Sequence, residues 1–150
     1  MRLNGKRILV PVDDTPVSED TFRWACQLAK NSKAELHLIY VNEVPMEFSL
    51  STEFVQEDNK GEQVLARLES IAEVEKCKVH GQLLQARHAG PAIVLEAEDR
   101  QMEVIVYGIP YRNHIGLSNL GPTAKYLLDH AACQVIFWRE SMPAAAVPHS

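Results

Sequence analysis

The chain has 150 residues, of which 46% are hydrophobic and 23% charged, and its 20 acidic and 15 basic residues give a formal net charge of -5. A chain of this length fits one domain with a single core, since single cores run to about 100 to 200 residues. Its apolar content excludes wholesale disorder. No basic run of the kind that follows a phosphate backbone is present, which argues against binding of nucleic acid.

Residues 1–14 show no signal-peptide cleavage pattern, and no stretch approaches the roughly 18 apolar residues of a membrane span. We therefore expect a cytoplasmic protein without a membrane span. Three cysteines, Cys26, Cys77 and Cys133, are widely spaced and lie in apolar runs. They are expected to be buried small side chains, because neither a disulfide framework nor a metal motif has this pattern.

The first elements carry clear local signals. Lys6 to Asp13 (KRILVPVD) is a short apolar run rich in β-branched residues, typical of a strand covered on both faces. Thr15 and Pro16 supply a capping hydroxyl and a first-turn proline, so a helix begins there and continues to about Asn31. Residues 34–42 read as a second buried strand, followed by a loop.

A charged, amphipathic pattern over residues 53–74 predicts a helix that is broken or irregular around Asn59 to Gly61. Downstream, the same kinds of pattern predict, in chain order, a strand over 77–86, a helix over 90–100, a strand over 103–107 that ends on Gly108, a helix over 121–131 and a strand over 133–139. Residues 141–150 have little that could pack, so we expect a flexible tail after a single domain over 1–140.

Strands that alternate with helices predict an α/β fold, a three-layer sandwich in which helices cover both faces of a five-stranded, mainly parallel sheet. In such sheets, ligands bind at the carboxyl ends of the strands, where the winding reverses. The strand ends at Asp13 and Gly108 are therefore the first place to look for a site.

Two segments of the chain resemble the universal stress protein family. Ile8 to Thr15 (ILVPVDDT) is similar to the family's first strand and its aspartate, and Glu103 to Glu140 (EVIVYG, LGPTAKYLLDHA and CQVIFWRE) follows the family's last third. With similar segments between them, LHLIYV over 36–41 and HAGPAIVLEAEDR over 88–100, the resemblance covers about residues 6–140. It implies a Rossmann-like, adenine nucleotide alpha hydrolase-like fold with strand order 3-2-1-4-5, which makes Asp13 and Gly108 neighbours.

In family members that bind ATP, the aspartate lies near the adenosine, the end of the second strand contacts the base, and a G-x2-G-x9-G-S/T motif holds ribose and phosphates. Here Gly108 and Gly121 keep the first and third glycine positions. Tyr111 replaces the second glycine and Pro122 replaces the Ser/Thr, with Thr123 one residue later. These changes weaken a phosphate cradle, because glycines allow close approach and proline lacks an N–H donor.

Other features of this segment favour an anion. Gly116 adds a glycine to the loop, the helix start at Gly121 presents free N–H groups, and Arg112, His114 and Lys125 add positive charge. The resemblance thus implies ATP, ADP or AMP as the ligand, with or without Mg. The ligand-binding residues that it implies are Pro11, Val12, Asp13, Asp14, Thr15, Val41, Gly108, Pro110, Tyr111, Arg112, Gly116, Gly121, Pro122 and Thr123.

Several of these residues have a simpler interpretation. Asp13 has the placement of a helix cap or turn former, the two glycines could serve turns at positive φ, and Tyr111 is either a lid over a base or a surface aromatic. His37, in a buried strand, is typical of a hydrogen-bonded core histidine. Adjacent Asp13 and Asp14 point apart, which disfavours an acid/base dyad.

These observations support three functions. The first is a stress-response or signalling module that binds an adenine nucleotide in the crevice. The second is a regulatory or protein-interaction domain of the same family with a degenerate phosphate loop and no nucleotide. The third is an enzyme with at most weak ATP hydrolysis, ranked last because no general base, metal ligand set or P-loop is visible.

The last strand is unusually apolar and is expected at the edge of the sheet. An exposed apolar edge favours pairing with another chain, and the family resemblance also implies dimers through this strand. We therefore expect a homodimer formed by Val135, Ile136, Phe137 and Trp138.

Overall fold

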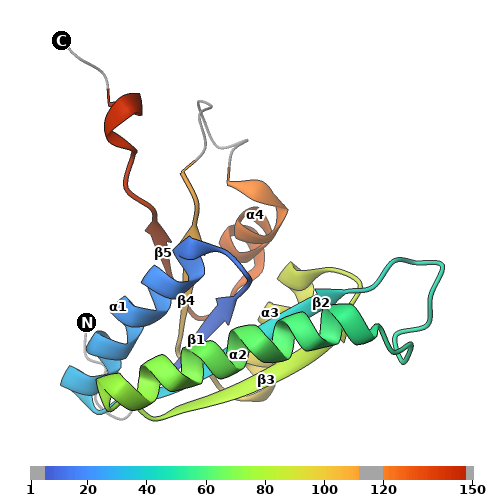
Figure 1. Ribbon diagram of the computed structural model, residues 1–150, viewed down its shortest axis with the longest axis horizontal. Coiled ribbons are helices and arrows are strands. Elements are labelled where there is room, and N and C mark those ends of the chain that lie inside the picture. The colour runs from blue at the N-terminus through green and yellow to red at the C-terminus, as the bar shows by residue number, and fades with distance from the viewer. Residues whose placement is uncertain (1–5, 112–119, 148–150) are drawn as a thin grey trace.

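The computed structural model describes residues 6–111 and 120–147, which form a parallel five-stranded sheet with order β3-β2-β1-β4-β5 between two layers of helices (Figure 1). This confirms the predicted fold and strand order. The strands are β1 (Arg7–Val12), β2 (Glu35–Glu43), β3 (Val79–Ala86), β4 (Val104–Ile109) and β5 (Gln134–Arg139). The helices are α1 (Pro16–Ser32), α2 (Val55–Glu75), α3 (Ala89–Asp99) and α4 (Gly121–His130).

Two apolar layers hold the helices to the sheet. Alternate residues of each strand face opposite sides, so Ile8 and Leu36 pack with Phe22 under α1 and α2. Leu9 and Ile39 belong to the opposite layer, under α3 and α4. Strands buried on both faces read as continuous apolar runs, which is why the sequence identified them.

The start of α1 follows its sequence signals. Thr15 has extended backbone, its hydroxyl accepts a hydrogen bond from the Ser18 N–H at 3.4 Å, and Pro16 begins the helix. Lys33 closes the helix in the left-handed conformation at φ 52°, with its N–H bonded to the Ala29 carbonyl. The turn that carries Asp13 is therefore fixed by the helix cap that follows it.

The predicted break in α2 is wrong, because the helix is continuous through residues 59–61. Gly61 is buried where α2 lies close to the sheet. A Cβ at this position would lie 2.6 Å from Leu83 Cδ1 and 2.9 Å from Tyr40 Cδ1. Glycine thus allows the close approach of a helix here and does not mark its end.

Strand β4 extends further than predicted. Gly108 is not its end but a ladder residue opposite Trp138, and Ile109 pairs with Arg139. Among the glycines that the structure describes, only Gly121 has a positive φ, at 81°. The positive-φ interpretation therefore holds for Gly121 and is wrong for Gly108. The other strands begin and end within two residues of their predicted limits.

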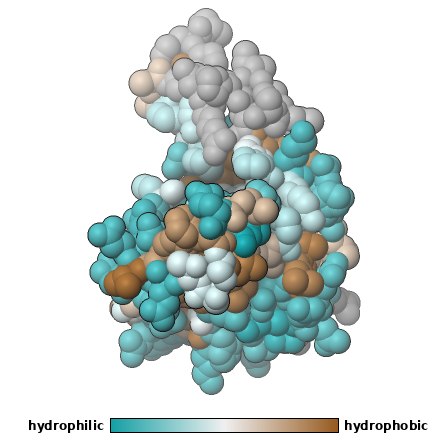
Figure 2. Space-filling model, turned by 90° about the vertical axis from the view of Figure 1, so that its right-hand side faces the viewer, coloured by the Kyte–Doolittle hydropathy of each residue, from teal (hydrophilic) through white to brown (hydrophobic). Residues whose placement is uncertain are grey.

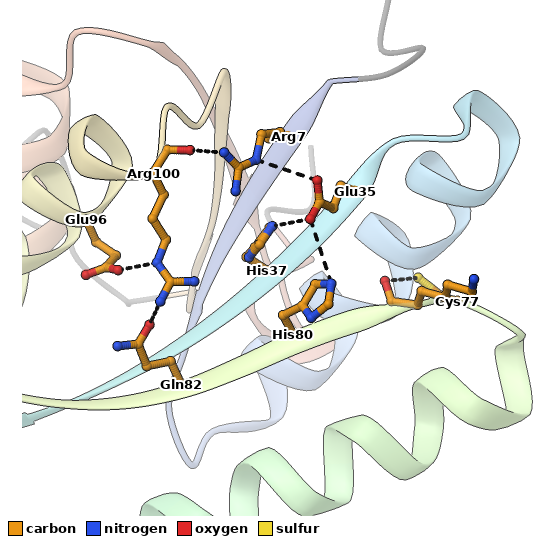
Figure 3. A network of polar contacts seen from close by, with 9 residues as sticks. Arg7, Glu35, His37, Cys77, His80, Gln82, Glu96 and Arg100 are labelled. Carbon is orange, nitrogen blue, oxygen red and sulfur yellow. Dashed lines mark hydrogen bonds and ion pairs between the residues drawn. The ribbon is translucent and has the colours of Figure 1, made fainter.

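A polar network ties together the amino-terminal ends of the strands, away from Asp13 and Gly108 (Figure 3). The Glu35 carboxylate lies 3.1 Å from His37 Nε2, 3.6 Å from Arg7 Nε and 3.7 Å from His80 Nε2. Arg7 also donates to the carbonyl of Arg100. Burial lowers the pKa of His37, which is a buried core residue as the sequence indicated. The predicted hydrogen bond is not found among the described residues, because neither ring nitrogen has a hydrogen-bond partner there.

The described part of the tail leaves β5 and contains one 3-10 turn, Ala144–Ala146, which projects from the body of the fold (Figure 1). None of the helices within residues 6–111 and 120–147 combines the length and hydropathy needed to cross a bilayer.

Candidate functional site

A cavity of about 140 Å³ lies at the carboxyl ends of β1 and β4, the place that the strand order indicates. Six of the sequence-predicted residues line it: Pro11, Val12, Asp13, Val41, Gly108 and Thr123. Residues that were not predicted complete the wall: Ser18, Ile39, Glu43, Ala89, Ile93 and Tyr107. The structure therefore brings segments from β1, β2, β4 and three helices to one crevice.

Asp13 stabilises the start of α1 and also lines this cavity. Its Oδ1 accepts hydrogen bonds from the Thr15 hydroxyl and from Ser18 Oγ, the latter at 2.8 Å, and its N–H donates to Ser18 Oγ at 2.9 Å. None of the described residues hydrogen-bonds to the other carboxylate oxygen, Oδ2. Asp13 thus organises the start of α1 with one oxygen and retains the second as an acceptor.

Asp14 belongs to a different surface. Its carboxylate lies 3.8 Å from Lys60 Nζ and 3.6 Å from Arg67 Nη2, both on α2. The two adjacent aspartates therefore point apart, as the sequence predicted. Neither Asp14 nor Thr15 lines the cavity: Asp14 pairs with α2, and Thr15 caps α1.

A second cavity of about 250 Å³ adjoins the first and shares Glu43, Ala89 and Thr123 with it. The amino-terminal ends of α3 and α4 meet there, together with Pro122. Glu43 Oε2 accepts the Ala89 N–H at 3.1 Å and thereby satisfies the start of α3.

Glu43 has no counterpart at the start of α4 among the described residues, and the N-cap residue Leu120 makes no side-chain cap hydrogen bond. Pro122 lacks an N–H, so the donors left at this helix start are those of its neighbours, Gly121 and Thr123. Free N–H groups and the positive end of the helix dipole favour an anion. Lys125, exposed one residue after the buried Ala124, adds a positive charge to the same turn.

Tyr111 does not line either cavity. Its N–H donates to Glu140 Oε1 at 3.3 Å, and the Arg139 guanidinium lies 5.8 Å from the centre of its ring. Pro110, just before it, is also absent from the walls of both cavities. Three residues expected to add glycine or positive charge, Arg112, His114 and Gly116, lie outside the described residues.

A loop with three exposed hydrophobic side chains follows Glu43, which lines both cavities. Residues 44–54 join β2 to α2, and Met46, Phe48 and Leu50 are exposed on it. Figure 2 shows the side of the molecule on which this loop lies. Hydrophobic side chains form a patch there among hydrophilic ones. Arg87 holds the loop by donating to the carbonyls of Pro45 and Phe48, both at 2.7 Å. Over the described parts of the chain, no three His, Cys, Asp or Glu residues gather to hold a metal ion.

The comparison with known families agrees with this architecture. The family model described as "Universal stress protein family" matches residues 5–139. The chain belongs to the universal stress protein family. A universal stress protein of Methanocaldococcus jannaschii is 30% identical over 139 residues, which cover 87% of this chain and 80% of that protein.

Solved structures of this family share the fold. A universal stress protein from Archaeoglobus fulgidus matches with a TM-score of 0.72 at 20% identity, covering 89% of this chain and 93% of that one. The A. fulgidus protein in complex with dAMP matches with a TM-score of 0.70 at 20% identity, covering 88% and 96%. A family member from Arabidopsis thaliana with AMP bound has a TM-score of 0.68 at 13% identity, covering 94% and 97%.

Proposed function

We propose that this protein is a stress-response or signalling module that binds an adenine nucleotide in the crevice between β1 and β4. The observation that carries the proposal is that Asp13 and Thr123 line one cavity, with the uncapped start of α4 beside them. Solved relatives with dAMP and AMP support the choice of ligand class.

The charged groups around the crevice favour one orientation of the nucleotide. The carboxylates of Asp13 and Glu43 lie on the β1 and β2 side of the crevice and repel phosphate. Asp13 Oδ2 is an acceptor for a ribose hydroxyl or for the amino group of adenine. The phosphates would then lie toward Gly121 and Thr123, where the helix start favours negative charge.

The space available is consistent with a ligand that spans both cavities. The first, of about 140 Å³, is smaller than the roughly 300 Å³ at the lower end of typical small-molecule sites. The adjoining cavity of about 250 Å³ meets it at Glu43, Ala89 and Thr123. In this arrangement the base packs against Ile39 and Val41, and the phosphates lie toward Thr123, which both cavities share.

Calorimetric titration of the full chain with AMP, ADP and ATP tests this function, with GMP, GDP and GTP as controls. We expect at least one adenine nucleotide to bind with micromolar affinity and the guanine nucleotides to bind more weakly. Absence of heat with every adenine nucleotide at millimolar concentration would instead favour the second candidate, a regulatory domain without nucleotide. Two features of the phosphate loop favour that candidate: Pro122 removes a donor, and Tyr111 is bonded to Glu140.

We also propose that the protein forms a homodimer through β5. This strand is at the edge of the sheet, and Val135, Ile136, Phe137 and Trp138 are all partly exposed. A free strand edge with apolar side chains pairs readily with a second copy. Sedimentation velocity at micromolar concentration is expected to give a dimer, and a monomer as the only species would rule this assembly out.

A further inference from the structure

Two cysteines that are distant in the sequence meet at the carboxyl ends of α1 and α2. Cys26 lies on α1 with 1% of its surface exposed, and Cys77 follows the last residues of α2. Cys77 packs against the apolar cluster that contains Cys26, and its thiol donates to the Lys78 carbonyl at 3.9 Å. An ion pair of 3.6 Å between Arg23 Nη1 and Glu75 Oε1 joins the same two helices beside them. Figure 1 shows these helix ends lying next to each other.

Only one member of this pair is open to solvent. Cys77 is partly exposed and lines an open groove of about 490 Å³ with, among others, Lys76, Lys78 and Val79. It lies in the connection between α2 and β3, where Lys76 ends the helix at φ 58° and the ladder begins only at Val79. Figure 3 shows Cys77 in this connection. A small reagent in solution therefore reaches Cys77 and not Cys26.

The surroundings also make the two thiols unequal. The neighbouring Cys26 thiol, helped by the charge of Lys30, lowers the pKa of Cys77. The neighbouring Cys77 thiol and burial raise the pKa of Cys26. Burial raises the pKa of Cys133, which is partly exposed but has no thiol partner among its contacts. Since the thiolate is the reactive form, Cys77 is the nucleophile among the three cysteines.

We propose that Cys77 is a peroxide-reactive site and that Cys26 converts its oxidised form into an intramolecular disulfide. The Cys77 thiolate attacks one oxygen of hydrogen peroxide, the O–O bond breaks, and hydroxide leaves, which gives a sulfenic acid. Cys26 then attacks the Cys77 sulfur, the S–O bond breaks, and water leaves as the S–S bond forms. Two electrons pass from the thiols to the peroxide, which is the only oxidant required.

The fold can accommodate this bond with a local movement. Disulfide formation needs the two sulfur atoms to approach to about 2.05 Å, closer than a non-bonded contact allows. Cys77 precedes the first paired residue of β3, and its N–H bonds to the Ala72 carbonyl at 2.8 Å. Movement of this short connection leaves the strand ladder intact, so the disulfide would fasten α1 to the end of α2.

Treatment of the reduced full chain with equimolar hydrogen peroxide, followed by intact mass and peptide mapping, tests the proposal. We expect a mass loss of two hydrogen atoms, a peptide that links Cys26 to Cys77, and full reversal by dithiothreitol. The Cys133→Ser variant should behave like the wild type, and Cys77→Ser should show no loss. A link between two chains, or oxidation of Cys133 ahead of Cys77, would overturn the assignment.

Two further measurements separate the roles of the two thiols. In Cys26→Ser, the Cys77 sulfenic acid should persist and be trapped by dimedone, because its resolving thiol is gone. Should this core variant fail to fold, alkylation of the native wild-type chain by iodoacetamide provides the same distinction. We expect Cys77 to react at least tenfold faster than Cys133, and Cys26 to react last. Equal rates at Cys77 and Cys133 would contradict the proposal.

Discussion

Replacing Gly108 with alanine is expected to lower the free energy of unfolding by about 1 to 3 kcal/mol, the usual cost of overpacking a core. A Cβ on residue 108 would overlap the Thr21 hydroxyl oxygen and lie 3.2 Å from Thr21 Cβ and 3.3 Å from the Val17 carbonyl oxygen. Thr21 is 1% exposed, and its hydroxyl donates to that carbonyl at 2.6 Å, so it has no free space to rotate into. Urea unfolding measures the loss.

Two variants check the cause of this effect. Gly81→Ala is the matched control, because Gly81 is exposed and the only close approach of its Cβ would be to the end of the flexible Glu69 side chain, with Leu65 Cδ2 at an ordinary 3.5 Å. Combining Gly108→Ala with Thr21→Ala removes the overlapping hydroxyl, so the double variant should lose less than the sum of the two single changes. If the free energy of unfolding of Gly108→Ala lies within about 0.5 kcal/mol of the wild-type value, then α1 is not packed tightly against residue 108.

The second large effect is expected at Asp13. Asp13→Ala should weaken binding of the adenine nucleotide by roughly 10- to 100-fold, the range for losing a hydrogen bond to a charged group. Asp14→Ala is the matched control, since its carboxylate faces Lys60 and Arg67 on α2. Calorimetric titration of the two variants should therefore give a loss for Asp13 only.

A structural effect of Asp13→Ala must be separated from a direct one. Asp13 Oδ1 accepts hydrogen bonds from the Thr15 and Ser18 hydroxyls, so alanine also loosens the start of α1. Asp13→Asn keeps one oxygen for these hydroxyls but removes the negative charge and replaces the second acceptor oxygen with an NH2 donor. We expect Asp13→Asn to unfold near the wild-type urea concentration and still to lose affinity. Equal affinities for the wild type and the Asp13 variants would place the nucleotide elsewhere.

The fold was predictable from sequence because its signals are local. Strands covered on both faces give continuous apolar runs, and the Thr15-Pro16 pair fixes the start of α1. The prediction of a break in α2 was wrong because a glycine within a helical pattern can either interrupt the helix or allow it to pack closely against its neighbours. Gly61 is required by the close approach of Tyr40 and Leu83, which a single sequence does not reveal. Gly108 is likewise explained by its contact with α1 and not by a turn.

The site was predictable where it lies on strand ends and less so elsewhere. The strand-end rule indicated Asp13 and Gly108, the family resemblance added Val41, and the strand-end rule applied to β2 would have indicated Glu43. Ser18 was missed because its contact with Asp13 depends on the turn between β1 and α1. The burial predicted for the cysteines is right for Cys26 and wrong for Cys77 and Cys133, which are partly exposed at the ends of helices.

The most direct test of the central claim is to map the nucleotide on the protein by NMR. Titration of isotope-labelled full chain with AMP should shift the backbone amide signals of Val41, Gly108 and Thr123, which come from three separate elements and line one cavity. Amides around Cys77, in the groove at the opposite end of α2, should not move. Shifts confined to residues outside the crevice, or no shifts at millimolar AMP, would contradict the account.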